Sequence, residues 1–453
     1  MAQVLWALFA PLIGCLLIYP YTNLRAMEPR WAGALLIFGA GTAAGIGGAS
    51  ILFFALHGIA LYVEVAALAW ACFEIYRTRD RIAARSQSSP GVWLLPLAIA
   101  AALGLAIATG VMNIVWDTNP QGNWDAWSIW NLRARFLASA GPLAARAFLP
   151  GLSGHPEYPL LTSGFIARCW TYAGADLGDI SSAAPIAMGY LFFLALLSIA
   201  AGGLAALRSR TLGVLFALAL LGSPLILAEV PAQYADVPLA CYFLAAAMFW
   251  LLDQPALAGI FASLAAWTKD EGLFFLAAFA VCAVVMDRGR IVRWAMGAAP
   301  VAALVLFFKA VLARGSDSLL ASSSHGVAAK ITAFSRYWQI AAAFASGFWN
   351  LHVDWYHPLL PLIALAVVLK ADSQWKRNLA FPGALFAAML AGFFGIFVIT
   401  SADLTWHLNT ALNRLIVQVW PLLLLSTFVC LRTPESTLVT MEPKQKGRQK
   451  DTK

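Results

Sequence analysis

The chain has 453 residues, of which 61% are hydrophobic and 11% charged, and its mean hydropathy is +0.76. A water-soluble globular protein does not have this balance, so the composition excludes the soluble classes. Many apolar runs approach the roughly 20 residues that a membrane-spanning helix needs, which is far longer than a barrel strand. We therefore expect an all-α polytopic membrane protein.

Apolar runs follow one another along the chain. They cover residues 3–20, 31–54, 56–76, 91–115, 158–174, 183–206, 211–229, 237–252, 255–267, 271–286, 291–312, 358–370, 379–400 and 409–431. Thirteen of them are expected to cross the membrane. The run at 158–174 is expected to enter and leave on one side as a re-entrant segment, because it has only 17 residues.

The basic residues give the predicted orientation. In this topology 20 of the 30 Lys and Arg residues fall on one side, which the positive-inside rule assigns to the cytoplasm. The net charge of +8 is then a consequence of topology, so no nucleic-acid partner is expected. The long connections at 116–157 and 313–357 are predicted to lie outside, and the C-terminal tail inside.

The first long polar break lies at 116–160 and contains the sequence NWDAWSIWNLRARF. Asn123 can cap a helix there. The helical repeat places four apolar side chains on one face: Trp127, Trp130, Ala134 and Leu137. A short amphipathic helix with tryptophans suits the boundary between membrane and water. Asp125 falls in its first turn, where the helix dipole favours a charged carboxylate.

Polar residues recur on the predicted outer side, at the ends of apolar runs. Besides Asp125 they are His155, Glu157 and Tyr158; Tyr234 and Asp236; Lys269, Asp270 and Glu271; and His407 with Arg414. A charge at membrane depth costs several kcal/mol and usually marks a functional site. We therefore take these residues as the candidate site.

Each of these residues also has a purely structural interpretation. Asp125 and Asp236 can cap or complement a helix N-terminus. Lys269 can form a structural ion pair with Asp270 or Glu271, and Arg414 can extend to the membrane surface. The remaining acid and the two histidines can be ordinary loop residues: Glu157, His155 and His407. Glu64 and Glu74 are expected to be packed acids within the third run.

No metal or cofactor is expected from the sequence, although a divalent ion at the site stays an open alternative. The six cysteines are scattered through apolar runs without metal-ligand spacing or a disulfide framework: residues 15, 72, 169, 241, 282 and 430. His352, Asp354 and His357 form a single H-x-D-x-x-H run, which is a weak metal signal.

Over residues 91–431 the sequence resembles the GT-C superfamily of membrane glycosyltransferases, such as the protein mannosyltransferases and the lipid A aminoarabinose transferases. Four motifs carry the resemblance: NWDAW around Asp125, HPEYPLL at 155–161, YADVPLA at 234–240 and WTKDEGL at 267–273. The last run, with Arg414 before Pro421, is also similar. The chain departs from that pattern in having a single acid at Asp125 and three runs before the core.

The resemblance implies inverting transfer of a sugar from a polyprenyl phosphate to a glycan, lipid or protein of the cell envelope, on the outer face of the inner membrane. A carboxylate would act as general base: Asp125, or alternatively Glu157 or Asp236. Lys269 and Arg414 would hold the lipid phosphate. Trp127 and Trp130 would stack on sugar. The other binding residues would be His155, Tyr158, Tyr234, Asp270, Glu271 and His407.

The implied organisation is an N-terminal three-helix extension at 1–90, a GT-C-like catalytic core at 91–433 and a disordered basic tail at 434–453. A transporter or flippase of lipid-linked saccharides is the main alternative, because it would use the same outer cavity without making a bond. Transporters commonly contain internal repeats, and none is visible here. A scaffold subunit without activity is a third alternative.

Overall fold

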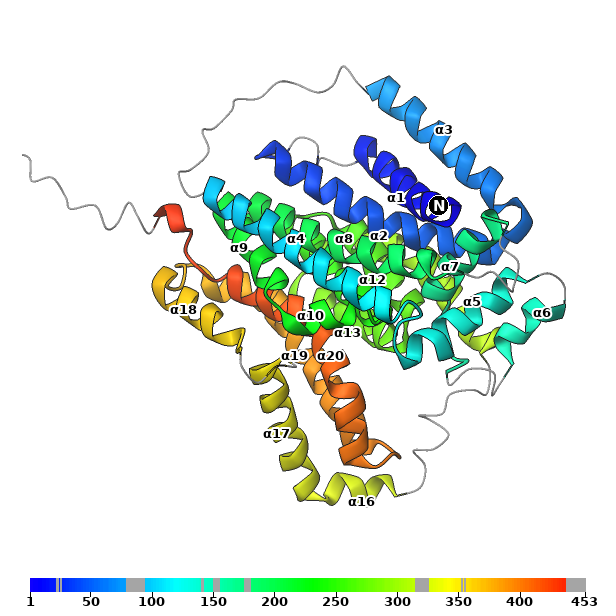
Figure 1. Ribbon diagram of the computed structural model, residues 1–453. Coiled ribbons are helices and arrows are strands. Elements are labelled where there is room, and N and C mark those ends of the chain that lie inside the picture. The colour runs from blue at the N-terminus through cyan, green and yellow to red at the C-terminus, as the bar shows by residue number, and fades with distance from the viewer. Residues whose placement is uncertain are drawn as a thin grey trace, which may run out of the picture.

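The computed structural model describes residues 1–21, 24, 27–78, 94–139, 142–149, 155–174, 181–313, 326–351, 353 and 356–436. Nearly all of these residues are helical (Figure 1). The described residues form no strand, and their single β-bridge joins Ala371 to Leu431. The predicted all-α class is therefore confirmed. Most of the predicted tail, from residue 437 onward, lies outside the described residues.

The helices follow the predicted apolar runs closely. The longer ones are α1 (Ala2–Tyr21), α2 (Arg30–Leu56), α3 (Ala60–Thr78), α4 (Leu94–Thr118), α8 (Ala183–Leu207), α13 (Asp270–Met286), α14 (Ile291–Phe307), α17 (Phe334–Asn350), α19 (Trp375–Ile399) and α20 (Leu404–Phe428). The shorter ones are α5 (Asn131–Ala138), α6 (Pro142–Ala145), α7 (Leu161–Tyr172), α9 (Arg210–Leu221), α10 (Pro224–Glu229), α11 (Asp236–Leu251), α12 (Pro255–Thr268), α16 (Val327–Thr332) and α18 (Leu359–Leu369).

The described helices make this a membrane protein. Seven described segments are long and apolar enough to cross a bilayer, and one of them contains both α2 and α3. The number of thirteen crossings is not reached by this criterion, because α2 and α3 count as one segment and α9, α11, α12, α13 and α18 have only 12, 16, 14, 17 and 11 residues. At about 1.5 Å per residue they are shorter than a hydrocarbon core of about 30 Å.

One predicted run is broken in the structure. The apolar stretch at 211–229 forms two helices, α9 and α10, that are separated at Gly222 and Ser223. Pro224 has no N–H to continue the hydrogen bonds of α9, and it begins α10 instead. The hydroxyl of Ser223 is used by the core, since it accepts a hydrogen bond of 2.6 Å from the Trp420 indole on α20.

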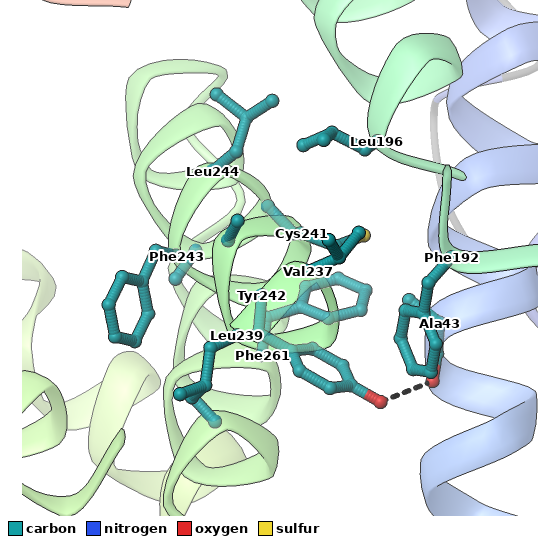
Figure 2. Close-up of a cluster of buried hydrophobic side chains, with 14 of the residues drawn as sticks. Ala43, Phe192, Leu196, Val237, Leu239, Cys241, Tyr242, Phe243, Leu244 and Phe261 are labelled. Atoms are coloured by element: carbon teal, nitrogen blue, oxygen red, sulfur yellow. Dashed lines mark hydrogen bonds between the residues drawn. The ribbon is translucent and has the colours of Figure 1, made fainter. Parts of the chain in front are cut away.

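Helix α11 is the centre of the bundle. All of its residues from Asp236 to Trp250 are buried, and it packs against α8, α12 and α20. Figure 2 shows its side chains packed against α8, through Phe192 and Leu196, and against Phe261. The Tyr242 hydroxyl donates a 2.9 Å hydrogen bond to the Ala43 carbonyl on α2. The position of the α11 N-terminus is therefore fixed from several sides.

The segment predicted to be re-entrant contains the short helix α7. It has 12 residues, and those from Leu161 to Trp170 are all buried, so it lies within the protein and is too short to cross a bilayer. It packs against both α2 and α5. Its Arg168 is paired with Glu64 on α3, so α7 connects the N-terminal helices to the region around α5.

The amphipathic helix around Asp125 differs from the prediction in two respects. The side chain of Asn123 does not cap it, since its Oδ1 accepts a 2.9 Å hydrogen bond from Asn119. Residues Ala126–Trp130 form a π-helical turn, which contains more residues per turn than an α-helix. The turn shifts Trp127 away from the buried face, and its side chain is 45% exposed, whereas Trp130 is fully buried.

Candidate functional site

The site is built around Asp236, the first residue of α11. Its side chain has no exposed surface, and three side chains donate to it. Lys269 Nζ and Gln418 Nε2 contact Oδ1 at 3.1 and 2.6 Å, and Arg414 Nε contacts Oδ2 at 3.1 Å. A buried carboxylate is tolerated when its oxygens are satisfied in this way. Asp236 thus fixes two cations, from α20 and from the turn between α12 and α13.

Arg414 joins Asp236 to Asp125. Its Nη2 lies 2.6 Å from Asp125 Oδ2, and its guanidinium lies 4.5 Å from the centroid of the Tyr234 ring. Asp125 does not cap its helix, because its side chain accepts no capping hydrogen bond there. The side chains of Asp125 and Arg414 are 17% and 19% exposed. The structure therefore brings together four predicted residues and leaves one edge of the group accessible.

Hydrogen bonds between two loops explain why Asp125 reaches this position. The Asn123 amide donates 3.1 Å to the carbonyl of Ala232, and Gln233 Nε2 donates 2.9 Å to that of Pro120. Gly122 makes this approach possible: its φ is +73°, and a Cβ there would lie 2.6 Å from the Ala232 oxygen. The loop before α11 and the segment before Asp125 are thus held together by one bond between their backbones and one from the Gln233 side chain.

Lys269 extends the group of charges toward α13. Its ammonium lies 2.9 Å from Glu271 Oε1, whose side chain is 14% exposed. Asp270 points to a different partner, since its Oδ1 lies 2.6 Å from Lys309 on the π-helical turn that follows α14. The predicted pair of Lys269 with Glu271 is therefore confirmed, and Asp270 is not part of it. The charges alternate along one row: Asp125, Arg414, Asp236, Lys269 and Glu271.

The loop between His155 and Tyr158 borders this row. Arg133 on α5 fixes the loop, because its guanidinium donates to the carbonyls of Tyr158 and His155 at 2.5 and 2.8 Å. Burial lowers the pKa of Arg133 to about 10, and the nearby Glu157 charge opposes this shift, so the group stays protonated at neutral pH. His155 Nδ1 lies 2.8 Å from Glu157 Oε1, and Glu157 Oε2 is buried without a partner among the described residues.

Tyr158 connects this loop to the row of charges. Its ring stacks on the rings of His155 and Trp130, with centroids 4.5 and 5.5 Å apart, and Lys269 Nζ lies 5.6 Å from its centroid. Burial raises the pKa of Tyr158 well above its usual value, so the phenol stays neutral. The ring is therefore an uncharged wall beside Lys269.

Two predicted residues do not fit the roles predicted for them. Trp130 has no exposed surface and packs on Tyr158, so it supports the wall and offers no free face to a sugar. His407 contacts Thr400 through Nδ1 at 2.9 Å and packs against Phe397. It lies seven residues before Arg414 on α20, about 10 Å along the helix. None of the contacts described for His407 involves the row of charges.

Four residues near the site escaped the sequence interpretation. Gln418 lies one turn after Arg414 on the same helix, and this spacing was a usable signal. Lys309 was also detectable as a lone charge inside an apolar run. Arg133 gave no such signal. Glu229 stands close to Asp236 in sequence, and its Oε2 is buried without a partner among the described residues.

The described residues contain no group of three His, Cys, Asp or Glu side chains that could hold a metal ion. Of the H-x-D-x-x-H run, His352 and Asp354 lie outside the described residues, and His357 stacks on Trp349. Comparison of the chain with protein-family models, with curated proteins and with solved structures found no match. The chemistry of this site therefore has to be inferred from the residues themselves.

Proposed function

We propose that this chain is an inverting glycosyltransferase that moves a sugar from a polyprenyl phosphate to a cell-envelope acceptor. In this proposal it crosses the inner membrane thirteen times and acts on the outer face. The observation that supports it best is the row of alternating charges at the N-terminus of α11, in which Asp236 holds Arg414 and Lys269 beside the accessible Asp125. Such a transfer requires cations that stabilise the leaving phosphate and a carboxylate that accepts the proton of the acceptor hydroxyl.

The two cations suit the leaving phosphate. Arg414 uses Nε and Nη2 for the two acids, and a guanidinium has five N–H groups, so donors remain for an incoming anion. Lys269 stands on the other side of Asp236. When the bond between the anomeric carbon and the phosphate oxygen breaks, negative charge grows on that oxygen, and fixed cations stabilise it.

Asp125 is proposed as the general base. The acceptor hydroxyl oxygen attacks the anomeric carbon, its proton passes to the Asp125 carboxylate, and polyprenyl phosphate leaves from the opposite face of the sugar. The contact of 2.6 Å with Arg414 places the Asp125 carboxylate beside the cation proposed to bind the donor phosphate. A phosphate that competes for the same guanidinium would loosen this pair, and the Asp125 carboxylate would then be free to approach the acceptor hydroxyl.

The other acids differ from Asp125 in their surroundings. Asp236 has no exposed surface and receives three hydrogen bonds, which suits a residue that positions Arg414 and Lys269. Glu157 is the alternative base, because its Oε2 has no partner among the described residues. Its side chain is only 6% exposed and one oxygen contacts His155, so it is the less accessible of the two candidates.

A groove near the row of charges suits the lipid chain of the donor. Helices α13 and α14 border an open groove of about 360 Å³ that is lined by apolar residues, among them Leu273, Leu276, Ala280 and Trp294. Leu273 is one turn after Asp270, the partner of Lys309, so the groove begins near that ion pair, at the same end of α13 as Glu271. An alkyl chain gains free energy when it leaves water for such a surface. Its position therefore fits a donor with a charged head and an apolar tail.

The test is whether the purified protein breaks the bond between the sugar and the phosphate of the donor. In detergent, where no compartments exist, a transferase releases polyprenyl phosphate from a radiolabelled polyprenyl-phosphate sugar when acceptor membranes from a deletion strain are present. A flippase leaves the donor intact. Arg414→Gln should lower kcat/KM for the donor by roughly 10- to 100-fold, because a charged hydrogen bond contributes about 1.5–3 kcal/mol.

Asp253→Asn is a matched control, since Asp253 lies just beyond the other end of α11 and its side chain is 73% exposed. It should leave the rate unchanged. An intact donor in detergent, together with movement of the same donor across liposomes that contain the protein, would reject the transferase and favour the flippase.

A further inference from the structure

A second cavity lies at the other end of α20 from the charged row. It measures about 790 Å³, is open on one side and is bordered by α18, α19 and α20, with Ala366, Trp375, Gly383 and Leu423 among its lining residues. Leu423 is nine residues after Arg414 on α20, about 14 Å along the helix. The cavity is thus separate from the candidate site.

The wall of this cavity offers an occupant few hydrogen-bonding groups, because its uncharged polar side chains already donate to backbone carbonyls. Ser426 and Thr427 donate to carbonyls of their own helix at 2.8 and 3.0 Å. Cys430 Sγ contacts the Ser426 carbonyl at 3.1 Å. Among the described residues that line the cavity, Lys376 is the one with a charge, and its ammonium lies 5.7 Å from the centroid of the exposed Trp375 ring. An occupant would therefore meet an apolar wall and a single cation.

The rim of the cavity is positively charged. Four exposed cations occur within or next to its lining segments: Lys370, Lys376, Arg377 and Arg432. The nearby acid, Asp372, is paired with Arg208 at 3.0 Å. This side of the protein is the one that the basic residues predict to be cytoplasmic.

The rim is also firmly built. The bridge between Ala371 and Leu431 joins the segment after α18 to the end of α20. The Asp372 amide donates 2.7 Å to the Cys430 carbonyl, and the Arg432 amide donates 3.1 Å to that of Lys370. These bonds hold the cationic segments at the mouth of the cavity. The position of the positive charges relative to the apolar space is therefore fixed.

We infer that this cavity binds an anionic phospholipid of the surrounding bilayer, with an acyl chain against α18, α19 and α20 and the phosphate at Lys376. Charge complementarity supports this occupant over a zwitterionic lipid, because the paired Asp372 leaves an excess of positive charge at the rim. Trp375, 40% exposed, has the amphipathic character of residues that lie at headgroup level. The inference does not depend on the proposed transferase activity.

The test measures lipid retention by native mass spectrometry, with thermal unfolding as a second readout. Full-length protein in a neutral detergent is given phosphatidylglycerol or phosphatidylcholine with identical acyl chains. We expect tighter retention of phosphatidylglycerol, and Lys376→Gln should reduce it about fivefold, the usual effect of one basic group near an anionic membrane surface. Both Lys376 and Ala380 are exposed, so substitutions there should leave the fold intact.

Two further variants separate a defined site from general attraction. Arg293→Gln removes an exposed cation at the start of α14, away from the cavity, and should leave retention unchanged. Ala380→Trp fills the cavity and should reduce retention of both lipids. Equal retention of the two lipids, or equal losses for Lys376→Gln and Arg293→Gln, would overturn the inference. So would a lipid-free dimer that Ala380→Trp dissociates, because the occupant would then be a second copy of the chain.

Discussion

Two groups of charged side chains in this protein differ in how accessible they are and in how completely their charges are paired. Arg168 and Glu64 form a closed pair: Arg168 Nε donates 2.7 Å to one carboxylate oxygen and Nη2 donates to the other. Their side chains are 0% and 2% exposed, and Arg168 Nη1 donates 2.9 Å to the Trp6 carbonyl. The row at α11 is open. Asp125 and Arg414 at one end and Glu271 at the other are 14–19% exposed.

The difference shows that burial of charge alone does not identify a functional site. The closed pair has one cation for one acid, and it joins α3, α7 and α1. The open row has three acids, Asp125, Asp236 and Glu271, for the two cations Arg414 and Lys269. Unequal charge and access together leave room for a ligand to rearrange the pairing. The closed pair has no such freedom.

The largest expected effect is that of a substitution at Asp125, at one end of the open row. Asp125→Asn keeps the shape of the side chain and removes its basicity, so turnover should fall about 100- to 10,000-fold while donor binding survives. Single-turnover kinetics and donor-binding measurements on purified protein separate these two quantities. Asp117→Asn is the matched control, since Asp117 is an exposed acid at the end of α4.

A different result would move the catalytic role. If Asp125→Asn kept turnover within about tenfold of the native protein while Glu157→Gln lost it, Glu157 would be the base. If neither substitution changed turnover, the open row would be as structural as the closed pair, and the comparison between the two would fail.

Substitutions in the closed pair of Arg168 and Glu64 should change the stability of the protein and leave its turnover intact. Arg168→Met leaves Glu64 buried and unpaired, which should lower the free energy of unfolding by about 3–5 kcal/mol. Replacing both partners, Glu64→Leu with Arg168→Met, should recover most of this loss and retain turnover, because a well-packed apolar pair can replace a buried ion pair. The measurement is a double-mutant cycle: unfolding in detergent is compared for the native protein, Glu64→Leu, Arg168→Met and the double variant.

The same replacement at the open row sharpens the contrast. Asp236→Leu with Arg414→Met should not restore turnover, even in protein that folds. Recovery of full activity by this double variant would show that both groups of charges are structural. Loss of activity in the Glu64 and Arg168 double variant, with stability intact, would give the closed pair a role in the reaction.

The sequence was informative about helices and about charges at their ends. Apolar runs predicted most helix positions, because a helix that crosses the hydrocarbon core needs about 20 predominantly apolar residues. Asp236, Lys269 and Arg414 were recognisable as candidates because charges are costly beside such runs. The break at Pro224 was less visible, since the residues on both sides of it are equally apolar.

The pairings were beyond reach of a single sequence. Arg414 meets Asp125 only through tertiary structure, and Arg168 and Glu64 are 104 residues apart. The π-helical turn at Ala126–Trp130 also has no clear sequence signal, so a regular helical repeat placed Trp127 on the wrong face. Gln418 has no charge, and its contact with Asp236 became evident only once the two helices were placed side by side.

The smallest expected effect is at Trp127, which the π-helical turn leaves 45% exposed two residues from Asp125. If its ring stacks on the sugar, Trp127→Leu should raise the donor KM about two- to tenfold, since aromatic stacking contributes about 0.5–1.5 kcal/mol. Thermal unfolding should not change. Trp124→Leu is the control, because Trp124 is also exposed, at 67%, and lies in edge contact with Trp127. Equal changes in KM for both variants would mean that the pair of rings only anchors this segment at the membrane surface, and the open row would then bind its ligand by charge alone.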